Sequence, residues 1–535
     1  MKKEIVKFCI IAILAACSSC NELDLAPLNK FTDANYWTSA EKAEAVLNQA
    51  YSQMYSAGYY FNTECLSDNL YQRNSSNEKL ITSGQADAAN GRFAGEWSDC
   101  YEGIKSCHLF LENVDRVPMD EPLKNRMKAE ARFLRAFQYF RLATWYGAVP
   151  WFDYDPTVEE TKTIERTPYE QVVSWVRSEL NEIMGILPNK QQYAAADNGR
   201  ITCGAAAMLL ARTYLYENDW RNVANLCDKI IRGDYGKYAL FESANPSIHS
   251  YEGLFLPQNE FNSEVILDIQ YVPGVRTWDT YRDAIPLTVG GRVGSFAPTQ
   301  DLVDDYLMIN GRAINEAGSG YPDAPNNTNI YQNRDPRFAL TIVHHGYNWK
   351  NPDNSTTAIY MTGAQAGNNM YITSGNSTST GYFLRKWYDP TAPLSNIASG
   401  LNLILMRYAD VLLMYAEAKN ELGEMSEDVW DLTIRPIRER AGFYDAYALD
   451  YNGLSDMRQV IRRERRCELA LEGTRIQDLR RWKTAETVLN AVPRGASWHT
   501  ITLDARRFNR DRDYLWPVPQ EEKDINPNLG QNPNY

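Results

Sequence analysis

The sequence predicts a mostly α-helical protein, in which amphipathic helices stack in pairs and a long loop-rich insert with short strands interrupts them. Three observations support this fold class. Apolar residues recur about every 3.6 positions in long tracts before residue 235 and after residue 400. Between these tracts, residues 236–400 are rich in Gly, Asn, Ser, Thr and Pro and have no sustained helical period. One pair of tracts combines small and large residues in the way that stacked helical repeats do.

The first half of the chain contains several expected helices. Amphipathic patterns cover residues 40–55, 97–114 and 169–187. A longer tract over residues 129–145 ends before a glycine and a proline, which terminate helices. None of these helices can bury its apolar face alone, so we expect them to pack against one another in series.

Residues 205–231 predict two helices joined by a short polar turn at residues 217–219. Small Ala211 beside large Tyr and Leu residues looks like a tetratricopeptide unit, because a small residue lets the paired helix approach closely. The tracts 406–422 and 457–482 follow the same pattern. A tetratricopeptide-like scaffold is therefore the expected architecture on both sides of the insert.

The insert should form loops and small sheets that pack on this scaffold. Residues 264–271 are a short run rich in β-branched and apolar residues, as strands are. Long windows of the insert lack helical periodicity.

The amino terminus has the pattern of a secretory signal. Lys2 and Lys3 precede an apolar run of nine residues, 8–16, which is too short to span a bilayer. The Leu-Ala-Ala-Cys sequence that ends at Cys17 resembles the cleavage site of bacterial lipoproteins, and Cys20 is a second candidate for the lipid anchor. The multiple acyl chains of such an anchor would hold the mature protein firmly at a membrane.

These features divide the chain into four expected parts, of which those after residue 20 form one compact globular unit. The parts are residues 1–20, the signal peptide and anchor-cysteine region; 21–235, the N-terminal helical part; 236–400, the insert with the candidate ligand surface; and 401–535, the C-terminal helical part.

Composition excludes some classes of partner. With 535 residues, 44% hydrophobic and 23% charged, the chain has the composition of a large globular protein. Its formal net charge of −13 disfavours nucleic acid, since phosphate binding depends on clustered Lys and Arg. The cysteines outside the signal region show no metal-ligand spacing, and we expect buried thiols rather than disulfides. They are Cys65, Cys100, Cys107, Cys203, Cys227 and Cys467.

No sequence motif indicates catalysis. The chain lacks a zinc-protease helix motif, a nucleophile elbow and a phosphate-binding loop, and its five histidines show no ligand spacing beyond the adjacent His344 and His345. We therefore expect no catalytic residue, no metal and no cofactor. A glycosidase needs only two carboxylates a few ångströms apart, which leaves a glycoside hydrolase as a weaker alternative.

The arginine-rich segment 462–481 interleaves its cations with acids. Glu464, Glu468 and Glu472 recur every four residues on one helix face, a spacing at which ion pairs stabilise a helix by about 0.2–0.5 kcal/mol each. We expect these arginines to pair with carboxylates at a partly buried junction between the last repeat and the insert, because bidentate pairs fix orientation. The alternative is direct contact with a ligand.

A series of sequence phrases in the same order resembles the SusD/RagB family of outer-membrane lipoproteins. The C-terminal phrases are RRERRCELALEG at 462–473, DLRRW at 478–482, LWPVP at 515–519 and residues 526–533. Those of the insert are NSEVI at 262–266, PTQDLVDDY at 298–306, RDPRF at 334–338 and GYFLRKW at 381–387. Relatives often place the lipid cysteine directly before a segment like 21–27, which favours Cys20, whereas the local cleavage pattern favours Cys17.

The resemblance implies a function. Such a protein would bind glycans at the cell surface without cleaving them and deliver them to a TonB-dependent outer-membrane barrel of the SusC type. It would be lipid-anchored in the outer membrane, face outward and touch the membrane only through its anchor. A peptide-binding lipoprotein of the RagB kind, working in the same type of importer, is the alternative.

Sugar binding would use aromatic rings and planar polar groups on loops. Three stretches have this composition: 68–74, 276–282 and 345–350. Trp278 and Trp349 are expected to form part of a stacking platform, although a loop aromatic can instead fasten its loop to the scaffold. The candidate ligand-binding residues are Tyr71, Arg73, Asn74, Trp278, Tyr281, Arg282, Tyr347 and Trp349.

Overall fold

A computed structural model gives the structure of most of the chain. It describes residues 36–73, 76–292, 294, 296–326, 328–369, 378–392, 398–451, 456–498 and 502–535. The expected signal region, the two candidate anchor cysteines Cys17 and Cys20, and the candidate ligand residue Asn74 lie outside the described residues.

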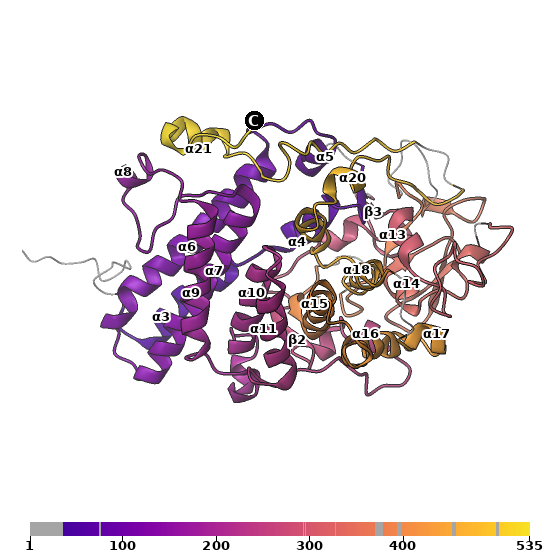
Figure 1. Ribbon diagram of the computed structural model, residues 1–535, viewed down its shortest axis with the longest axis horizontal. Helices are drawn as coiled ribbons and strands as arrows, with labels where there is room; N and C mark the ends of the chain where they lie inside the picture. Colours follow the sequence, from indigo (N-terminus) through magenta and orange to yellow (C-terminus); the bar gives the residue numbers. More distant parts are fainter. Residues whose placement is uncertain are drawn as a thin grey trace, which may run out of the picture.

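The N-terminal half is a row of helices, as the apolar periodicity predicted (Figure 1). Neighbours in this row pack in the order α6, α7, α9, α10 and α11, and α3 packs on α6. Their bounds are α3 Ala40–Ser52, α6 Gly91–Asn113, α7 Glu121–Tyr146, α9 Tyr169–Met184, α10 Cys203–Leu215 and α11 Trp220–Arg232. Shorter helices are α4 Ala57–Cys65, α5 Asn77–Thr82 and α8 Val158–Thr161.

Capping residues in the sequence explain where helices α10 and α11 begin and where α11 ends. The Thr202 hydroxyl accepts a hydrogen bond from the Ala205 amide at the start of α10, and Asp219 caps α11 through the Asn222 amide. Gly233 ends α11 with φ +86°, a left-handed conformation that favours glycine. The two helices joined by a polar turn are thus confirmed.

The C-terminal helices continue the row, because α15 packs on α11. Two details differ from the expectation. The tract 457–482 is broken between α18 and α19, where Leu471 and Gly473 adopt positive φ. Helix α16 was not expected, and it contains Pro436 in its interior. The bounds are α15 Tyr408–Glu421, α16 Glu427–Ala441, α17 Ala446–Leu449, α18 Met457–Glu468, α19 Arg475–Arg481, α20 Ala485–Val488 and α21 Gln520–Ile525.

Short antiparallel strand pairs fasten the insert. Strands β2 and β8 pair where the chain enters and leaves the insert, and β1 of the N-terminal part pairs with β3 of the insert. Within the insert, β4 pairs with β7 and β5 with β6. The bounds are β1 Leu70–Gln72, β2 Val265–Ile269, β3 Phe296–Pro298, β4 Ile342–Val343, β5 Tyr347–Lys350, β6 Thr356–Ile359, β7 Phe383–Leu384 and β8 Leu403–Arg407. Helices α12 Ser250–Gly253, α13 Gln300–Asp305 and α14 Pro336–Thr341 also belong to the insert.

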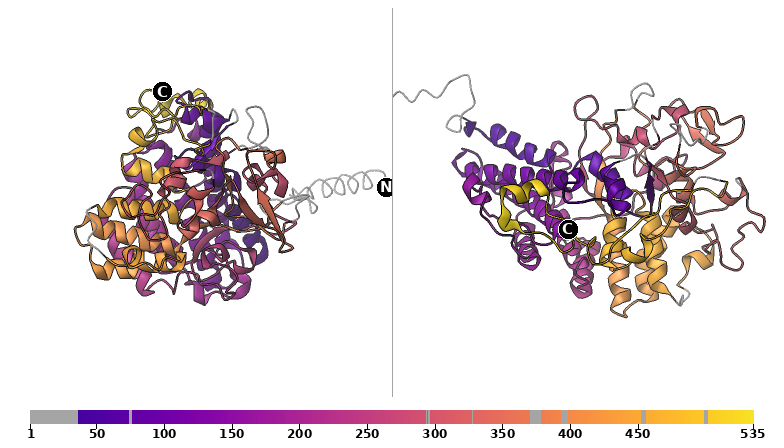
Figure 2. Two further views of the ribbon diagram at one scale, coloured as in Figure 1. Left: turned by 90° about the vertical axis from the view of Figure 1, so that its right-hand side faces the viewer. Right: turned by 90° about the horizontal axis from the view of Figure 1, so that it is seen from above.

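The insert and helices α16, α17 and α18 lie toward one end of the molecule, and helices α3, α6, α7 and α9 form the other end, where the C-terminal helix α21 also lies (Figures 1 and 2). One hydrophobic core runs through both, from Trp37 to Leu529. The six cysteines expected to be buried thiols are free and buried. None of the described helices combines the length and apolarity needed to cross a membrane.

A buried carboxyl in β2 should make stability depend on pH. Asp268 is 4% exposed and accepts a hydrogen bond from Asn402 Nδ2 at 3.0 Å. Burial raises the pKa of Asp268 to about 7, and the nearby Glu260 contributes. Because this folded-state pKa lies above the unfolded value near 3.9, the stability from the neutral form is present at low pH and is lost as pH rises through about 7.

Asp268→Asn should remove this dependence. We expect the variant to gain about 2–3 kcal/mol more stability relative to wild type at pH 8 than at pH 5, by urea unfolding at both pH values. Asp323→Asn, at an exposed position, should show no such difference. An equal effect of Asp268→Asn at both pH values would contradict a neutral buried carboxyl.

Candidate functional site

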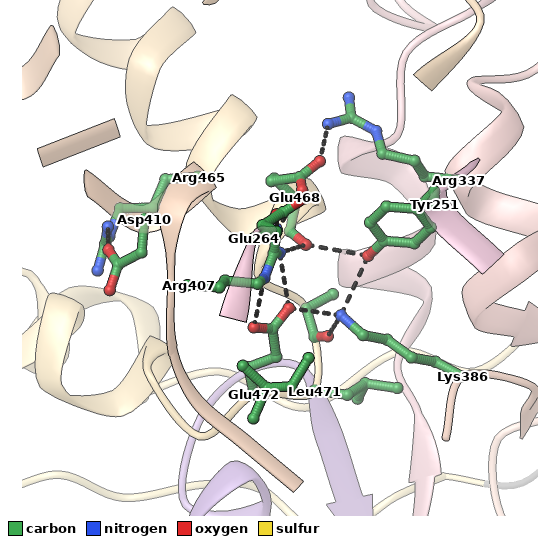
Figure 3. Close-up of polar contacts among 12 residues, drawn as sticks. Tyr251, Glu264, Arg337, Lys386, Arg407, Asp410, Arg465, Glu468, Leu471 and Glu472 are labelled. Atoms are coloured by element: carbon green, nitrogen blue, oxygen red, sulfur yellow. Dashed lines mark hydrogen bonds and ion pairs between the residues drawn. The ribbon is translucent and has the colours of Figure 1, made fainter. Parts of the chain in front are cut away.

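A buried ion network joins α18 to the insert (Figure 3). Among the described residues, five cations meet five carboxylates in it, and their side chains are at most 5% exposed. The cations are Arg337, Lys386, Arg407, Arg438 and Arg440, and the carboxylates are Glu264, Asp335, Glu464, Glu468 and Glu472.

Arg407, the last residue of β8, lies at the centre of this network. Its Nη1 lies 2.7 Å from Glu264 Oε1 and 2.6 Å from Glu468 Oε1. Its Nε and Nη2 bind the two carboxylate oxygens of Glu472 at 2.8 and 2.7 Å. One guanidinium thus connects the beginning of β2, helix α18 and the turn after it.

The insert supplies further cations to the same carboxylates. Arg337 of α14 lies 2.7 Å from Glu464 and 2.8 Å from Glu468, and Lys386 Nζ lies 2.6 Å from Glu472 Oε1. Burial opposes the charge of Glu468, but Arg440, Arg407 and Arg337 hold the pKa of its carboxyl well below the usual range. Burial lowers the pKa of Lys386 to about 8 despite its pairing with Glu472.

The glutamates of the arginine-rich segment thus pair with cations from outside it. Arginines of the segment pair as well: Arg465 lies 2.8 Å from Asp478 and contacts Asp410, and Arg481 lies 2.6 Å from Glu417. These pairs confirm that the segment pairs its charges at a buried junction. The charges of the ion network are engaged with one another and their side chains are closed to solvent. A buried, paired charge holds elements in a fixed orientation but offers no free group to a ligand.

Other arginines of the segment fix the first candidate stretch. Arg466 Nη2 and Arg475 Nε each lie 2.8 Å from the Asp68 carboxylate. Although burial opposes ionisation, these two cations hold the pKa of Asp68 below its usual range. Arg466 also donates to Asn69 Oδ1 at 2.8 Å. The base of the stretch 68–74 is therefore attached to α18 and α19.

The second candidate stretch lies mostly inside the molecule. Trp278 is 6% exposed, its Nε1 donates to the Leu401 carbonyl at 2.7 Å, and its ring centre lies 5.3 Å from that of Phe61. Tyr281 is 1% exposed, and its hydroxyl donates to the Arg385 carbonyl at 2.9 Å. Arg282 is partly buried and donates to the Gly290 carbonyl at 3.3 Å.

Trp349 of the third stretch is fully buried. Its ring centre lies 4.8 Å from that of Tyr388, and the Arg385 guanidinium stacks over it at 4.6 Å. Neither Trp278 nor Trp349 presents a ring face to solvent, which contradicts the expectation of an exposed stacking platform at these two residues. The burial fits the alternative, in which loop aromatics fasten the insert to the scaffold. Tyr347 is half-buried, with its ring edge-on to His344.

Tyr71 of the first stretch lies beside exposed charge. Its hydroxyl lies 3.2 Å from Asp504 Oδ2 and accepts a hydrogen bond from Lys79 Nζ at 2.7 Å. Lys79 also pairs with Asp504 at 2.8 Å, and the Asp504 side chain is 71% exposed. Arg73 follows β1 and is half-buried. The roles of Tyr71 and Arg73 in ligand binding remain a prediction.

The structure adds an aromatic cluster that sequence reasoning missed. The His345 ring lies 5.9 Å from the Trp498 ring and 5.5 Å from the Tyr360 ring, and Trp498 and Tyr360 are half-buried. Trp498 packs on Gly381, where an added Cβ would lie 2.8 Å from the indole and φ is +86°. A Trp within the Gly- and Ser-containing segment 493–498 was the available signal.

The C-terminal segment contacts both the first and the third stretch. Trp498 contacts His345, and Asp504, six residues later, contacts Tyr71. Six residues of extended chain span at most about 20 Å, which is the upper limit on the separation of Trp498 and Asp504. We name this set the loop surface; it consists of Tyr71, Lys79, His345, Tyr360, Trp498 and Asp504.

The charged groups near the loop surface are paired with one another. Asp301 and Asp304 both pair with Arg494, at 2.5 and 2.7 Å. Across the described ranges, no three His, Cys, Asp or Glu side chains converge in a way that could hold a metal ion. Of the rings in the loop surface, those of Tyr360 and Trp498 are half-buried, whereas Tyr71 and His345 are buried, at 6% and 8% exposed. Half-buried rings beside charged groups suit recognition of a polyhydroxylated ligand.

Comparisons with known proteins relate both halves of the chain to one group. Residues 263–535 match the family model described as "SusD family", and residues 23–215 match one described as "Starch-binding associating with outer membrane". SusD-like protein P2 of Formosa agariphila is 26% identical over 555 residues, with 100% of both chains covered.

Solved structures of similar proteins share the fold. A SusD-like carbohydrate binding protein from Bacteroides fragilis has 28% sequence identity and a TM-score of 0.82, with 92% of this chain and 99% of that chain covered. A second SusD-like protein from the same species has 28% identity and a TM-score of 0.78, with 95% and 100% covered.

Proposed function

Because this chain belongs to the SusD family, we propose that it captures glycans at the cell surface without cleaving them and that the loop surface contacts the sugar. This proposal depends on a difference in solvent exposure between the charged side chains of α18 and the side chains of the loop surface. Glu464, Arg465, Arg466 and Glu468 of α18 are buried and paired. Trp498 and Tyr360 are half-buried, and the Asp504 side chain is exposed. Binding groups on loops held by a rigid scaffold are a common arrangement.

The chemistry of the loop surface fits sugars. The CH-rich face of a sugar ring packs on an aromatic ring, and its hydroxyls pair with charged and planar polar groups. Trp498 and Tyr360 supply rings, while Lys79 and Asp504 supply a donor and an acceptor. Arg73, Arg282 and Tyr347 are candidate flanking contacts. The relatives' descriptions as starch-binding and carbohydrate binding support the same ligand class.

A binder of this kind needs a transporter to use what it captures. We propose delivery to a TonB-dependent barrel of the SusC type, with a lipid on Cys20 or Cys17 holding the protein at the outward face of the outer membrane. Purification from detergent-solubilised membranes should recover a large barrel protein together with this chain. Repeated recovery of the chain alone would count against this partner.

An array of glycans and peptides tests the ligand class. We expect the purified protein to retain one or a few oligosaccharides and no peptide, and to leave the bound glycan intact when products are analysed by chromatography. Retention of peptides alone would favour a peptide importer of the RagB kind. Release of shortened sugars would show a glycoside hydrolase instead.

A further inference from the structure

A cavity with a volume of about 270 Å³ lies where four helices of the scaffold meet. It is lined by residues of α7 and α19, by the first residues of α9, by the residue after α10 and by residues 514 and 515. Helices α7, α9 and α10 are neighbours in the helical row (Figure 1). None of the lining residues belongs to the loop surface, so the cavity is a separate place in the fold.

Four charged side chains line this cavity, and three of them have no ion-pair partner among the described residues. Arg481 is paired, because its guanidinium lies 2.6 Å from the Glu417 carboxylate. Arg480, Lys483 and Glu170 are the three without such a partner. Two positive charges and one negative charge thus leave the wall with one net positive charge.

The hydrogen bonds of Arg480 go to neutral groups, although its side chain is buried at 7% exposed. Its Nη1 donates to Gln477 Oε1 at 2.8 Å, and its Nη2 donates to the Thr144 carbonyl at 3.0 Å and to the Tyr514 carbonyl. Its Nε has no acceptor among the described residues. Because all three acceptor residues line the cavity, the guanidinium lies in the cavity wall.

The charge of Arg480 is compensated only in part. The end of α7, to which Thr144 belongs, carries about half a negative charge, and a buried cation without a full counter-charge is costly. Burial lowers the pKa of Arg480 to about 10. Arg465 differs: burial opposes its charge too, but Asp410 and Asp478 hold its pKa above the usual range. Arg480 is therefore a buried cation that lacks an anion.

Lys483 brings a second cation to the same place. Its side chain is exposed, and its Nζ lies 4.2 Å above the ring centre of Tyr514. Burial and the nearby Arg480 lower the pKa of Lys483, whereas Glu486 opposes this shift without forming an ion pair. Two cations without ion pairs thus lie close to each other at this cavity.

Uncharged polar groups of the wall also lack protein partners. Thr144 Oγ1 and the Tyr514 hydroxyl are buried and form no hydrogen bond with the described residues. The hydroxyls of half-buried Tyr169 and Tyr216, which also line the cavity, likewise form none within the part of the chain that the structure describes. Buried polar groups without partners call for an explanation, and a bound hydroxylated molecule would supply one.

We propose that this cavity binds a sugar acid, a single sugar ring with one carboxylate, and that the carboxylate lies on Arg480 with Lys483 beside it. A planar guanidinium matches the geometry of a carboxylate. One net positive charge in the wall favours a monoanion over a phosphate dianion, and the free hydroxyls favour a hydroxylated acid over an aliphatic one. The volume exceeds the roughly 150 Å³ that holds one benzene, so one six-membered ring fits.

Calorimetric titration of the purified protein at low salt with three matched probes tests the proposal. Glucuronate supplies the ring and the charge, glucuronamide keeps the shape without the charge, and glucose lacks the carbonyl group. We expect glucuronate to bind at least about tenfold more tightly than either neutral probe, because only its charge compensates Arg480. No binding of glucuronate, or equal affinity for glucuronate and glucuronamide, would overturn the proposal.

A disaccharide that ends in glucuronate distinguishes two sources of the same chemical group. Affinity equal to that of glucuronate would identify the end of an acidic glycan as the ligand. Weaker binding of the disaccharide would identify the free sugar acid. Both results require that glucuronate itself binds.

Substitutions of the three unpaired charges locate the site. Arg480→Gln should reduce glucuronate to the affinity of glucuronamide. Lys483→Gln, at an exposed position, should weaken glucuronate about threefold, and Glu170→Gln should tighten it by a similar factor, the size of a surface charge interaction. Neither should change the affinity for glucuronamide. Lys237→Gln, which removes an exposed lysine outside the cavity, is the matched control and should bind as wild type does.

The two exposed positions decide the outcome even if Arg480→Gln fails to fold. Glucuronate affinity that does not change in opposite directions in Lys483→Gln and Glu170→Gln would refute this site. Trp498→Ala should leave glucuronate binding intact, because the loop surface is separate from the cavity. Glucuronate binding that survives Arg480→Gln but is lost in Trp498→Ala would place the sugar acid on the loop surface instead.

Discussion

Replacing Glu468 by glutamine should lower the free energy of unfolding by about 3–5 kcal/mol, because it leaves buried cations without their shared partner. Glu468 is fully buried and contacts Arg407, Arg337 and Arg440. Glutamine keeps the shape of the side chain but not its charge, so the excess positive charge would remain in the core. The loss should appear in urea unfolding of the purified protein.

Arg458→Ala is the matched control on the same helix. Arg458 is 54% exposed and pairs with Glu421 at the surface, where an ion pair contributes about 0–1 kcal/mol. If Glu468→Gln cost no more than this control, the ion network would not be what fixes the insert on the scaffold.

Replacing Trp349 by alanine should have a comparable effect, a loss of about 3–5 kcal/mol, because it opens a cavity in the core. The indole is fully buried against Tyr388 and beneath the Arg385 guanidinium. Trp349→Phe, which retains part of the ring contact, should cost less. Thermal or urea unfolding of both variants gives the comparison.

The same variant distinguishes the two roles considered for Trp349. A residue that fastens the insert should change stability when it is removed. A residue that only stacks on a sugar should change affinity alone. Unchanged stability together with lost glycan affinity would restore the exposed platform and refute the burial seen here.

The helical scaffold could be predicted because the residues that specify each helix lie within that helix or next to it in the sequence. The small and large residues of 205–231 and the caps at Thr202 and Asp219 specify a helix pair without reference to the rest of the chain. That the charges of the arginine-rich segment are paired could also be predicted, since it interleaves cations with acids. Their partners could not, because Glu464 and Glu468 bind arginines of α14, β8 and α16 and not neighbours on their own helix.

The positions of the loop aromatics could not be predicted in the same way. Trp278 and Trp349 stand in polar, loop-forming sequence, and the local composition is the same whether a loop aromatic points inward or outward. Their burial depends on partners far along the chain, Phe61 for one and Tyr388 for the other. Trp498 was missed for the same reason, since its neighbour His345 is more than a hundred residues away in the sequence.

One helix and one helix end were not predicted from the sequence. Pro436 interrupts the helical pattern of α16, although the helix continues through it. Helix α18 ends at Glu468 within an apparently continuous tract, and the turn that follows contains Leu471 and Gly473 with positive φ. That break has a structural consequence, because the turn it makes carries Glu472 to Arg407 and Lys386.

The residues that stabilise the fold differ from those that we propose to bind the ligand. Most charged side chains of the segment that identifies the family are buried and paired, and they attach both the insert and the stretch 68–74 to the helical row. The groups left for a ligand lie on the loops that this segment holds. Changes to the loops could then alter ligand choice without disturbing the ion network.

Calorimetric titration of a Trp498→Ala variant with the glycan selected on the array tests this separation most directly. We expect affinity to fall about tenfold or more, since an aromatic face contributes on the order of 1 kcal/mol or more. The free energy of unfolding should fall less than in Trp349→Ala, because Trp498 is only half-buried. Tyr444→Ala, which removes an aromatic side chain that is 76% exposed and outside the loop surface, should bind as wild type does. Full affinity in Trp498→Ala would contradict glycan capture at the loop surface.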